Sequence, residues 1–150
     1  MKLYRGYQKP PEFLTPKLAQ EYEELKRLKK EIWAKNLSDP FEEMGEKRLN
    51  RLFELREIAA LQFFTDEEKA ARDVAGEKGF VVAVDLPDEL VQRYHQGEVY
   101  MAAGSRIVSN FVIRGKELAQ HLEDWKVEVI DIEKESTEGR INGEGESTKI

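Results

Sequence analysis

The chain has 150 residues, of which 40% are hydrophobic and 36% are charged, and its formal net charge is −6. This length and composition are typical of a globular protein with one core and a densely charged surface, and they exclude disorder throughout. The absence of cysteine excludes a disulfide framework and a cysteine nucleophile, and two histidines alone cannot make a metal centre.

The start of the chain and its hydropathy predict a cytoplasmic protein. Residues 1–5 lead into no apolar signal region, and no stretch approaches the roughly 20 apolar residues that a membrane span needs. The negative net charge argues against nonspecific nucleic-acid binding, which rests on a basic surface. One dense basic cluster, formed by Lys26, Arg27, Lys29 and Lys30, has glutamates beside it and is interpreted as the solvated face of a helix. We expect neither a membrane nor a nucleic acid as partner.

The first predicted elements are a short strand and a long helix. Residues 3–7 alternate bulky and polar side chains before a pair of prolines, which favours a strand that the prolines end. Thr15 followed by Pro16 is a typical helix start, with the hydroxyl as N-cap. Apolar residues then recur at helical spacing, so this helix is expected to run to about residue 35.

A second amphipathic helix is predicted for residues 40–60. Asp39 stands at its N-cap, and Glu42, three residues later, completes the spacing of a capping box. Apolar positions between 49 and 59 make a stripe wide enough to cover a sheet or to pair with the first helix.

The next part of the chain predicts strands separated by short helices. Residues 61–64 form a short apolar run, and Thr65 is expected to cap a helix that carries alanines inward and stops at Gly76. Residues 80–84 are apolar and rich in β-branched side chains, as in a strand buried on both faces. A short helix over residues 89–94 follows.

Three further strands are predicted at residues 99–102, 107–113 and 126–132, with a helix over residues 116–122 between the last two. Together with the earlier elements they predict an α+β fold.

One domain is expected over residues 1–133. Residues 134–150 hold almost nothing to bury and are predicted to form a disordered polar tail. Residues 3–7 are expected to join the sheet of the second half, which makes the two long helices over residues 15–60 an insertion between its strands.

Several segments carry a family resemblance through their order along the chain. They are Tyr4-Arg5-Gly6 on the first strand, residues 63–66 before an alanine-rich helix, residues 81–90 (VVAVDLPDEL), and residues 109–113 on the closing strand. In this arrangement the sequence resembles the ADP-ribosyltransferase superfamily, particularly its small bacterial and phage toxin-like members. The similarity extends over residues 3–6 and 62–118.

The resemblance implies a mixed or mostly antiparallel split sheet with the two long helices inserted after the first strand. It also implies NAD as the substrate, with transfer of ADP-ribose to a macromolecule, or hydrolysis of NAD. A protein is then expected as the acceptor or partner.

The resemblance also assigns roles to residues. Arg5 would bind phosphate through its planar fork of donors, and Thr65 would position the ribose. Tyr4, Tyr7 or Phe64 could stack on the nicotinamide. Gly6 completes the expected cofactor-binding set of Tyr4, Arg5, Gly6, Phe64 and Thr65.

Asn110 occupies the position on the closing strand where active members of the family usually carry a glutamate. An amide can donate and accept hydrogen bonds, but it cannot act as a base or stabilise a developing cation as a carboxylate does. By their positions, the resemblance implies Arg5, Thr65 and Asn110 as the catalytic residues, with Asn110 in place of the glutamate. Asp85, Glu98 and Glu117 are the carboxylates that might replace the missing one.

Two alternatives stand beside an NAD-binding ADP-ribosyltransferase-like protein. The first is a catalytically silent domain of the same fold that acts as a protein-binding or regulatory module through its charged helices, as Asn110 favours. The second is an unrelated interaction protein whose pair of helices dimerises.

Overall fold

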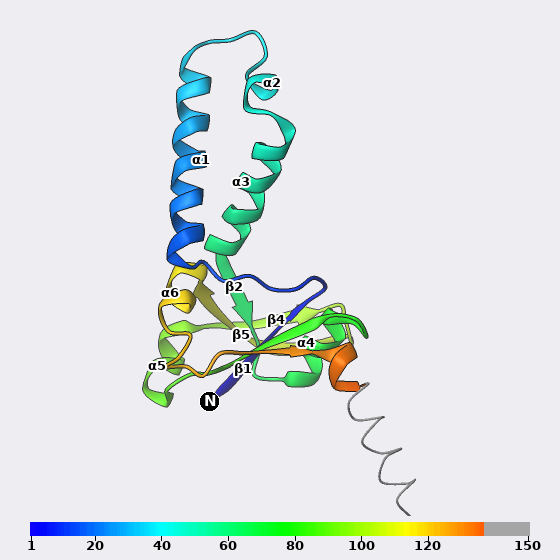
Figure 1. Ribbon diagram of the computed structural model, residues 1–150. Helices are drawn as coiled ribbons and strands as arrows, with labels where there is room; N and C mark the ends of the chain where they lie inside the picture. The colour runs from blue at the N-terminus through cyan, green and yellow to red at the C-terminus, as the bar shows by residue number, and fades with distance from the viewer. Residues whose placement is uncertain (137–150) are drawn as a thin grey trace, which may run out of the picture. The chain divides into compact units, whose positions relative to one another are not determined.

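The computed structural model describes residues 1–136, and the chain has an α+β fold with two small antiparallel sheets (Figure 1). Its contacts group into two compact units. The sheet unit consists of Met1–Pro11, Gln62–Ile113 and the described residues from His121 onward, and the helical unit consists of Glu12–Leu61 and Arg114–Gln120. The single domain expected over residues 1–133 stays a prediction.

The first sheet has the order β1-β3-β6. Its strands are β1 (Lys2–Tyr7), β3 (Phe80–Asp85) and β6 (Glu128–Asp131). Both pairings are antiparallel, with Arg5 opposite Val82 and Val82 opposite Val129. The expectation that the first strand joins strands of the second half is confirmed. β3 lies between the other two strands, and its side chains are buried, as its apolar sequence predicted.

The second sheet has the order β2-β5-β4. Its strands are β2 (Leu61–Phe64), β5 (Arg106–Arg114) and β4 (His95–Met101). An isolated antiparallel bridge pairs Tyr4 of β1 with Thr65, the residue after β2. This bridge brings an edge of the first sheet next to an edge of the second.

Two helices complete the core of the sheet unit. They are α4 (Glu68–Ala75) and α5 (Asp88–Tyr94). α4 lies against β1 and β3, and its Ala71 and Ala75 pack with Val81 of β3. Small side chains are needed there because the helix backbone approaches the sheet closely. α4 ends at Gly76, whose φ of 80° favours glycine, as the sequence predicted.

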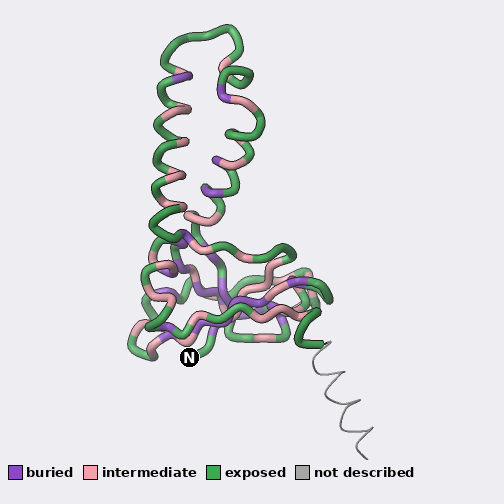
Figure 2. Tube along the Cα trace, in the orientation of Figure 1, coloured by how far each residue is buried: buried purple, intermediate pink, exposed green. Residues whose placement is uncertain are grey.

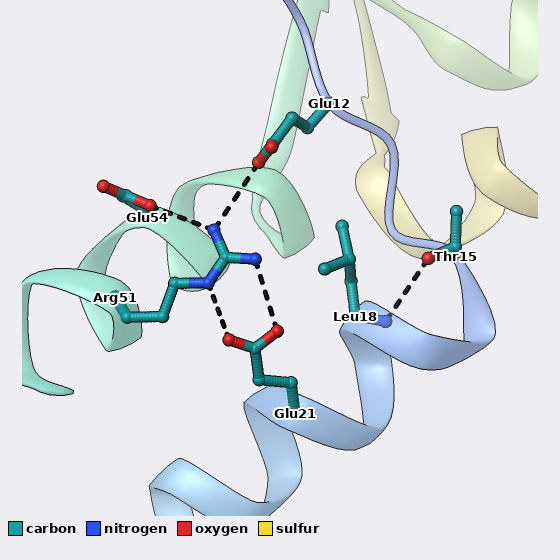
Figure 3. A network of polar contacts seen from close by, with 6 residues as sticks. All are labelled: Glu12, Thr15, Leu18, Glu21, Arg51 and Glu54. Atoms are coloured by element: carbon teal, nitrogen blue, oxygen red, sulfur yellow. Dashed lines mark hydrogen bonds and ion pairs between the residues drawn. The ribbon is translucent and has the colours of Figure 1, made fainter.

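The helical unit contains α1 (Pro16–Ala34), α2 (Pro40–Met44), α3 (Glu46–Ala59) and α6 (Gly115–Gln120). Most positions of α1 are exposed or intermediate in Figure 2, and Ile32 is its one buried residue. Ile32, Met44 and Leu52 form the centre of a small apolar cluster between the helices. Arg51 of α3 also forms ion pairs with Glu21 of α1 (Figure 3).

The N-caps expected for the first two helices are confirmed. The Thr15 hydroxyl accepts a hydrogen bond from the Leu18 amide at 3.3 Å, and the Asp39 carboxylate accepts one from the Glu42 amide at 3.1 Å. The single helix predicted over residues 40–60 is wrong, because Gly45 separates α2 from α3 with φ 87° and ψ 144°. Only glycine adopts that backbone conformation readily.

The last described residues, 132–136, are helical, although the polar tail was predicted from residue 134. Arg72 of α4 forms an ion pair with Glu135 at 3.2 Å. The remainder of the predicted tail lies outside the described residues. Within residues 1–136, none of the helices combines the length and the hydropathy that crossing a bilayer requires.

Candidate functional site

β1 places Arg5 and its neighbours beside α4. Leu3 of this strand is fully buried, and Gly6 lies so close to α4 that a Cβ there would collide with the backbone oxygen of Ala71 and lie 2.9 Å from the backbone nitrogen of Ala75. Close packing against α4 therefore explains why a glycine stands in the Tyr4-Arg5-Gly6 motif of this chain. Without a side chain at residue 6, the strand reaches the helix, and this fixes where Arg5 leaves the sheet.

The end of β2 meets β1 at the isolated bridge. The Tyr4 amide donates to the Thr65 carbonyl at 2.7 Å, and the Thr65 amide donates to the Tyr4 carbonyl at 2.9 Å. Phe64 and Thr65 are 2% and 5% exposed. These two hydrogen bonds hold the segment after β2 beside the strand that carries Arg5.

The expected role of Thr65 as the N-cap of α4 is wrong. The cap residue is Glu67, which makes no side-chain cap hydrogen bond. The Thr65 hydroxyl instead accepts from the Glu67 amide at 3.2 Å, which stabilises the turn between β2 and the helix. A hydroxyl that accepts one bond still has its own O–H to donate.

One cavity of about 210 Å³ in the sheet unit brings together the expected catalytic residues and the expected cofactor-binding set. Its lining includes Tyr4, Arg5, Gly6, Phe64, Thr65 and Asn110. They come from β1, from the end of β2 and from β5, which are far apart in sequence. Tyr7, another predicted stacking residue, does not line the cavity.

The rest of the lining is mostly apolar and was not predicted. It comprises Phe63, Ala71, Val74, Val99, Met101 and Val108. Val108 and Asn110 are two residues apart on β5, as are Val99 and Met101 on β4, so each pair shares a face of its strand. Alternation in the sequence could have indicated that shared face, but not that it borders Arg5.

The Arg5 guanidinium is bound to the backbone of β2 through one nitrogen, and another of its nitrogens has no partner among the described residues. Its Nη1 donates to the Phe63 carbonyl at 3.2 Å, and its guanidinium carbon lies 4.9 Å from the centre of the Tyr7 ring. Its Nε is buried and has no hydrogen-bond partner among residues 1–136. A buried donor without an acceptor is costly, so an incoming anion or carbonyl would satisfy it.

Tyr7 supports Arg5 from outside the cavity. The Tyr7 hydroxyl donates to Oε1 of the buried Gln62 at 3.2 Å. Burial raises the pKa of Tyr7, and the nearby Arg5 charge opposes that rise. The phenol therefore stays neutral at physiological pH, and its ring presents its face to the guanidinium.

The cavity has no carboxylate in its described lining. Asn110 is 8% exposed and provides an amide at the position where the resemblance leads us to expect a glutamate. Glu98 on β4 and Asp85 at the end of β3 belong to the sheet unit but do not line the cavity, and Glu117 belongs to the helical unit. None of the three replaces the missing carboxylate in this geometry.

No group of three or more residues that could hold a metal ion occurs within residues 1–136. Comparison of the chain with protein-family models, with curated proteins and with solved structures gives no match.

Proposed function

We propose that the sheet unit binds NAD as an ADP-ribosyltransferase-like domain, with the cavity beside Arg5 as the site. The observation that supports this proposal best is that Arg5, Thr65 and Asn110 line a single cavity. They come from β1, from the turn after β2 and from β5, and the sequence alone indicates them as candidates.

The size of the cavity suggests how NAD would bind. Pockets that enclose a drug-sized ligand typically measure roughly 300–1,000 Å³, whereas this cavity measures about 210 Å³. It suits the nicotinamide end of NAD, with Tyr4 and Phe64 as aromatic surfaces, while the rest of the dinucleotide lies outside. The unsatisfied Nε–H of Arg5 would then donate to a phosphate or ribose oxygen.

The reaction proposed for an active protein is substitution at C1′ of the nicotinamide ribose. The bond between C1′ and the nicotinamide nitrogen breaks, and its electron pair leaves with nicotinamide as a neutral molecule. An acceptor group or water forms the new bond to C1′ and gives up a proton. Thr65 would orient the ribose through its free O–H, and Asn110 would hydrogen-bond a ribose hydroxyl without supplying negative charge.

Incubation of the purified protein with NAD tests the proposal directly. NAD at a hundred times its Kd would stabilise the fold by about 2.7 kcal/mol, so a rise in melting temperature is expected even without turnover. Nicotinamide release, followed by chromatography, measures turnover. No shift at saturating NAD together with no release would refute the proposal.

Arg5→Ala should remove the NAD-induced shift. Arg93→Ala is a matched control, because Arg93 is an exposed arginine of the same unit on α5 and does not line the cavity. Equal NAD affinity in the two variants would mean that the site lies elsewhere.

The second candidate function is a catalytically silent module on the same scaffold that binds NAD, or a protein, without chemistry. The specific observation in its favour is the buried Asn110 in a cavity lining without a carboxylate. An NAD-induced shift with no nicotinamide release would favour this candidate.

A further inference from the structure

A second cavity, in the helical unit, has a chemical character of its own. It measures about 420 Å³ and lies between α1 and α3, which pack against each other (Figure 1). This volume falls within the range typical of ligand-binding pockets. We call it the interhelical groove.

The floor of the interhelical groove is apolar and aromatic. We use this name for the four lining residues that are apolar or aromatic, which are Leu52 and Phe53 of α3 and Tyr22 and Trp33 of α1. Leu52 is buried, and Phe53 is 51% exposed. Covering an exposed phenylalanine with an apolar side chain is favourable, because it removes apolar surface from water. The Lys26 ammonium lies 4.3 Å from the centre of the Tyr22 ring, and Trp33 packs against Phe41. Phe53 is therefore the aromatic surface that the floor offers to an apolar side chain.

The walls of the groove are basic on both sides. Lys26, Lys29 and Lys30 come from α1, and Arg56 comes from α3. Lys26 and Lys30 are four residues apart, as a shared helix face requires. The basic cluster is therefore more than the solvated face of a helix, because its three lysines also line a groove with aromatic residues.

Among the described residues, three of these four cations have no carboxylate partner. Lys26 pairs with Glu23 at 2.7 Å, and this hydrogen bond raises the pKa of Lys26. Lys29 lies 5.3 Å from the centre of the Trp33 ring. Within residues 1–136, Lys30 and Arg56 form no ion pair, and no acidic residue lines the groove.

The positive groove contrasts with the charge of the chain. The helical unit holds twelve basic and twelve acidic residues, so its formal charge is zero, while the whole chain carries −6. A local concentration of four cations in such a chain attracts a specific anionic segment, whereas the overall charge repels a long polyanion. The charge pattern therefore favours a short acidic segment over a nucleic acid.

We propose that the interhelical groove binds an acidic peptide segment of a partner protein, anchored by an apolar side chain on the aromatic floor. The groove face of α1 runs from Tyr22 to Trp33, which corresponds to about 16 Å at the helical rise. That length matches about three turns of an acidic amphipathic helix. Its carboxylates contact the lysines of α1 and Arg56, and its apolar stripe covers Phe53.

Fluorescence anisotropy with synthetic peptides tests this proposal on the full chain. The probe is a labelled amphipathic peptide of about three helical turns, with glutamates on one face and leucine or phenylalanine on the other. One control peptide has every glutamate replaced by glutamine, and a single-stranded oligonucleotide of similar length is the competing polyanion. The acidic peptide should bind at least about tenfold more tightly than the glutamine peptide, and salt should weaken its binding.

Substitutions in the groove test whether the acidic peptide binds there. Lys30→Glu and Phe53→Ala should each weaken the acidic peptide about tenfold or more. Arg27→Glu is the matched control, because it reverses an exposed charge on α1 that does not line the groove. Far-UV circular dichroism establishes that each variant is folded.

Three outcomes would overturn the proposal. The first is equal binding of the glutamate and glutamine peptides, and the second is an equal effect of Lys30→Glu and Arg27→Glu. The third is tighter binding of the oligonucleotide than of the acidic peptide, which would identify the groove as a nucleic-acid site instead.

Discussion

Gly6 lies where β1 passes directly against the backbone of α4. The structure leaves no room for a Cβ between this strand and the backbone of Ala71 and Ala75. A larger residue must push the strand away from the helix, and Arg5 and the bridge at Tyr4 would move with it. Because residue 6 has no side chain, β1 can lie against α4, and this places the backbone of the neighbouring Arg5.

We predict that Gly6→Ala destabilises the protein by about 1–3 kcal/mol, the usual cost of overpacking. Urea unfolding measures this change. Gly97→Ala is the comparison, because a Cβ there meets nothing within 4 Å, although its φ of 89° costs a side chain about 1 kcal/mol. A Gly6 variant as stable as the wild type would mean that β1 and α4 can separate freely.

Asn110 supports a second prediction, which rests on the proposed function. Asn110→Glu places a carboxylate in the lining of the cavity beside Arg5 and Thr65. It should raise the rate of nicotinamide release on the order of 10²-fold, the typical effect of one well-placed electrostatic group. Asn110→Gln is the neutral control. Equal rates in the two variants would argue against a catalytic role for this position.

At the scale of elements, Arg51 joins α1 to α3 (Figure 3). Its Nε and Nη2 bind the two carboxylate oxygens of Glu21 at 2.7 and 3.2 Å. Its Nη1 lies 3.0 Å from Glu54 and 3.7 Å from Glu12. The bidentate geometry fixes the helices in register more firmly than a single contact would. The hydrogen bond from Arg51 also lowers the pKa of Glu21.

Arg51→Ala should lower the melting temperature at neutral pH, and this loss should shrink in acid. Because the native pKa of Glu21 lies below its unfolded value, the pair stabilises fully above an unfolded pKa of about 4.3. The stabilisation is lost as the pH falls through the lower native pKa. Arg48→Ala, an exposed arginine of the same helix, is the control. Thermal unfolding at several pH values measures both variants, and a loss that does not depend on pH would contradict the prediction.

Local sequence signals predicted most elements because they act through neighbouring residues. Thr15 and Asp39 could be recognised as caps because a hydroxyl or carboxylate binds an amide only three residues away. The break at Gly45 was missed because apolar residues recur at helical spacing on both sides of it, so their periodicity gives no sign that one helix ends and another begins. Thr65 was misassigned as a cap because its hydroxyl binds an amide two residues away instead.

The candidate site was predictable only in part, because its lining residues are far apart in the sequence. Arg5, Thr65 and Asn110 were identified through the order of their segments, and the structure brings them to one cavity. Val99 and Val108 pair with each other between the neighbouring strands β4 and β5. They were missed because their place beside Arg5 depends on contacts between segments far apart in sequence, which a local pattern does not encode. The split-sheet arrangement of an ADP-ribosyltransferase stays a prediction, beyond the two antiparallel sheets that the structure has.

For the whole molecule, the two candidate sites belong to different units and share no residue. We therefore predict that a variant at one site loses its own ligand and keeps binding at the other site. Arg5→Ala should abolish the NAD-induced thermal shift and leave acidic-peptide binding within twofold of the wild type, and Lys30→Glu should do the reverse. Titration of each ligand against both variants measures this. A change of NAD affinity in the Lys30 variant would instead indicate energetic coupling between the sites.

The bridge between Tyr4 and Thr65 also has a kinetic consequence. Its partners are separated by about 60 residues, so their pairing closes a long loop, which costs more conformational entropy than a local turn. Helices within that loop can form in about a microsecond, whereas long-range closure of this kind is slower. The cavity beside Arg5 should therefore appear late in refolding. A ligand that fluoresces when it enters the cavity would report a slower phase than the helical signal.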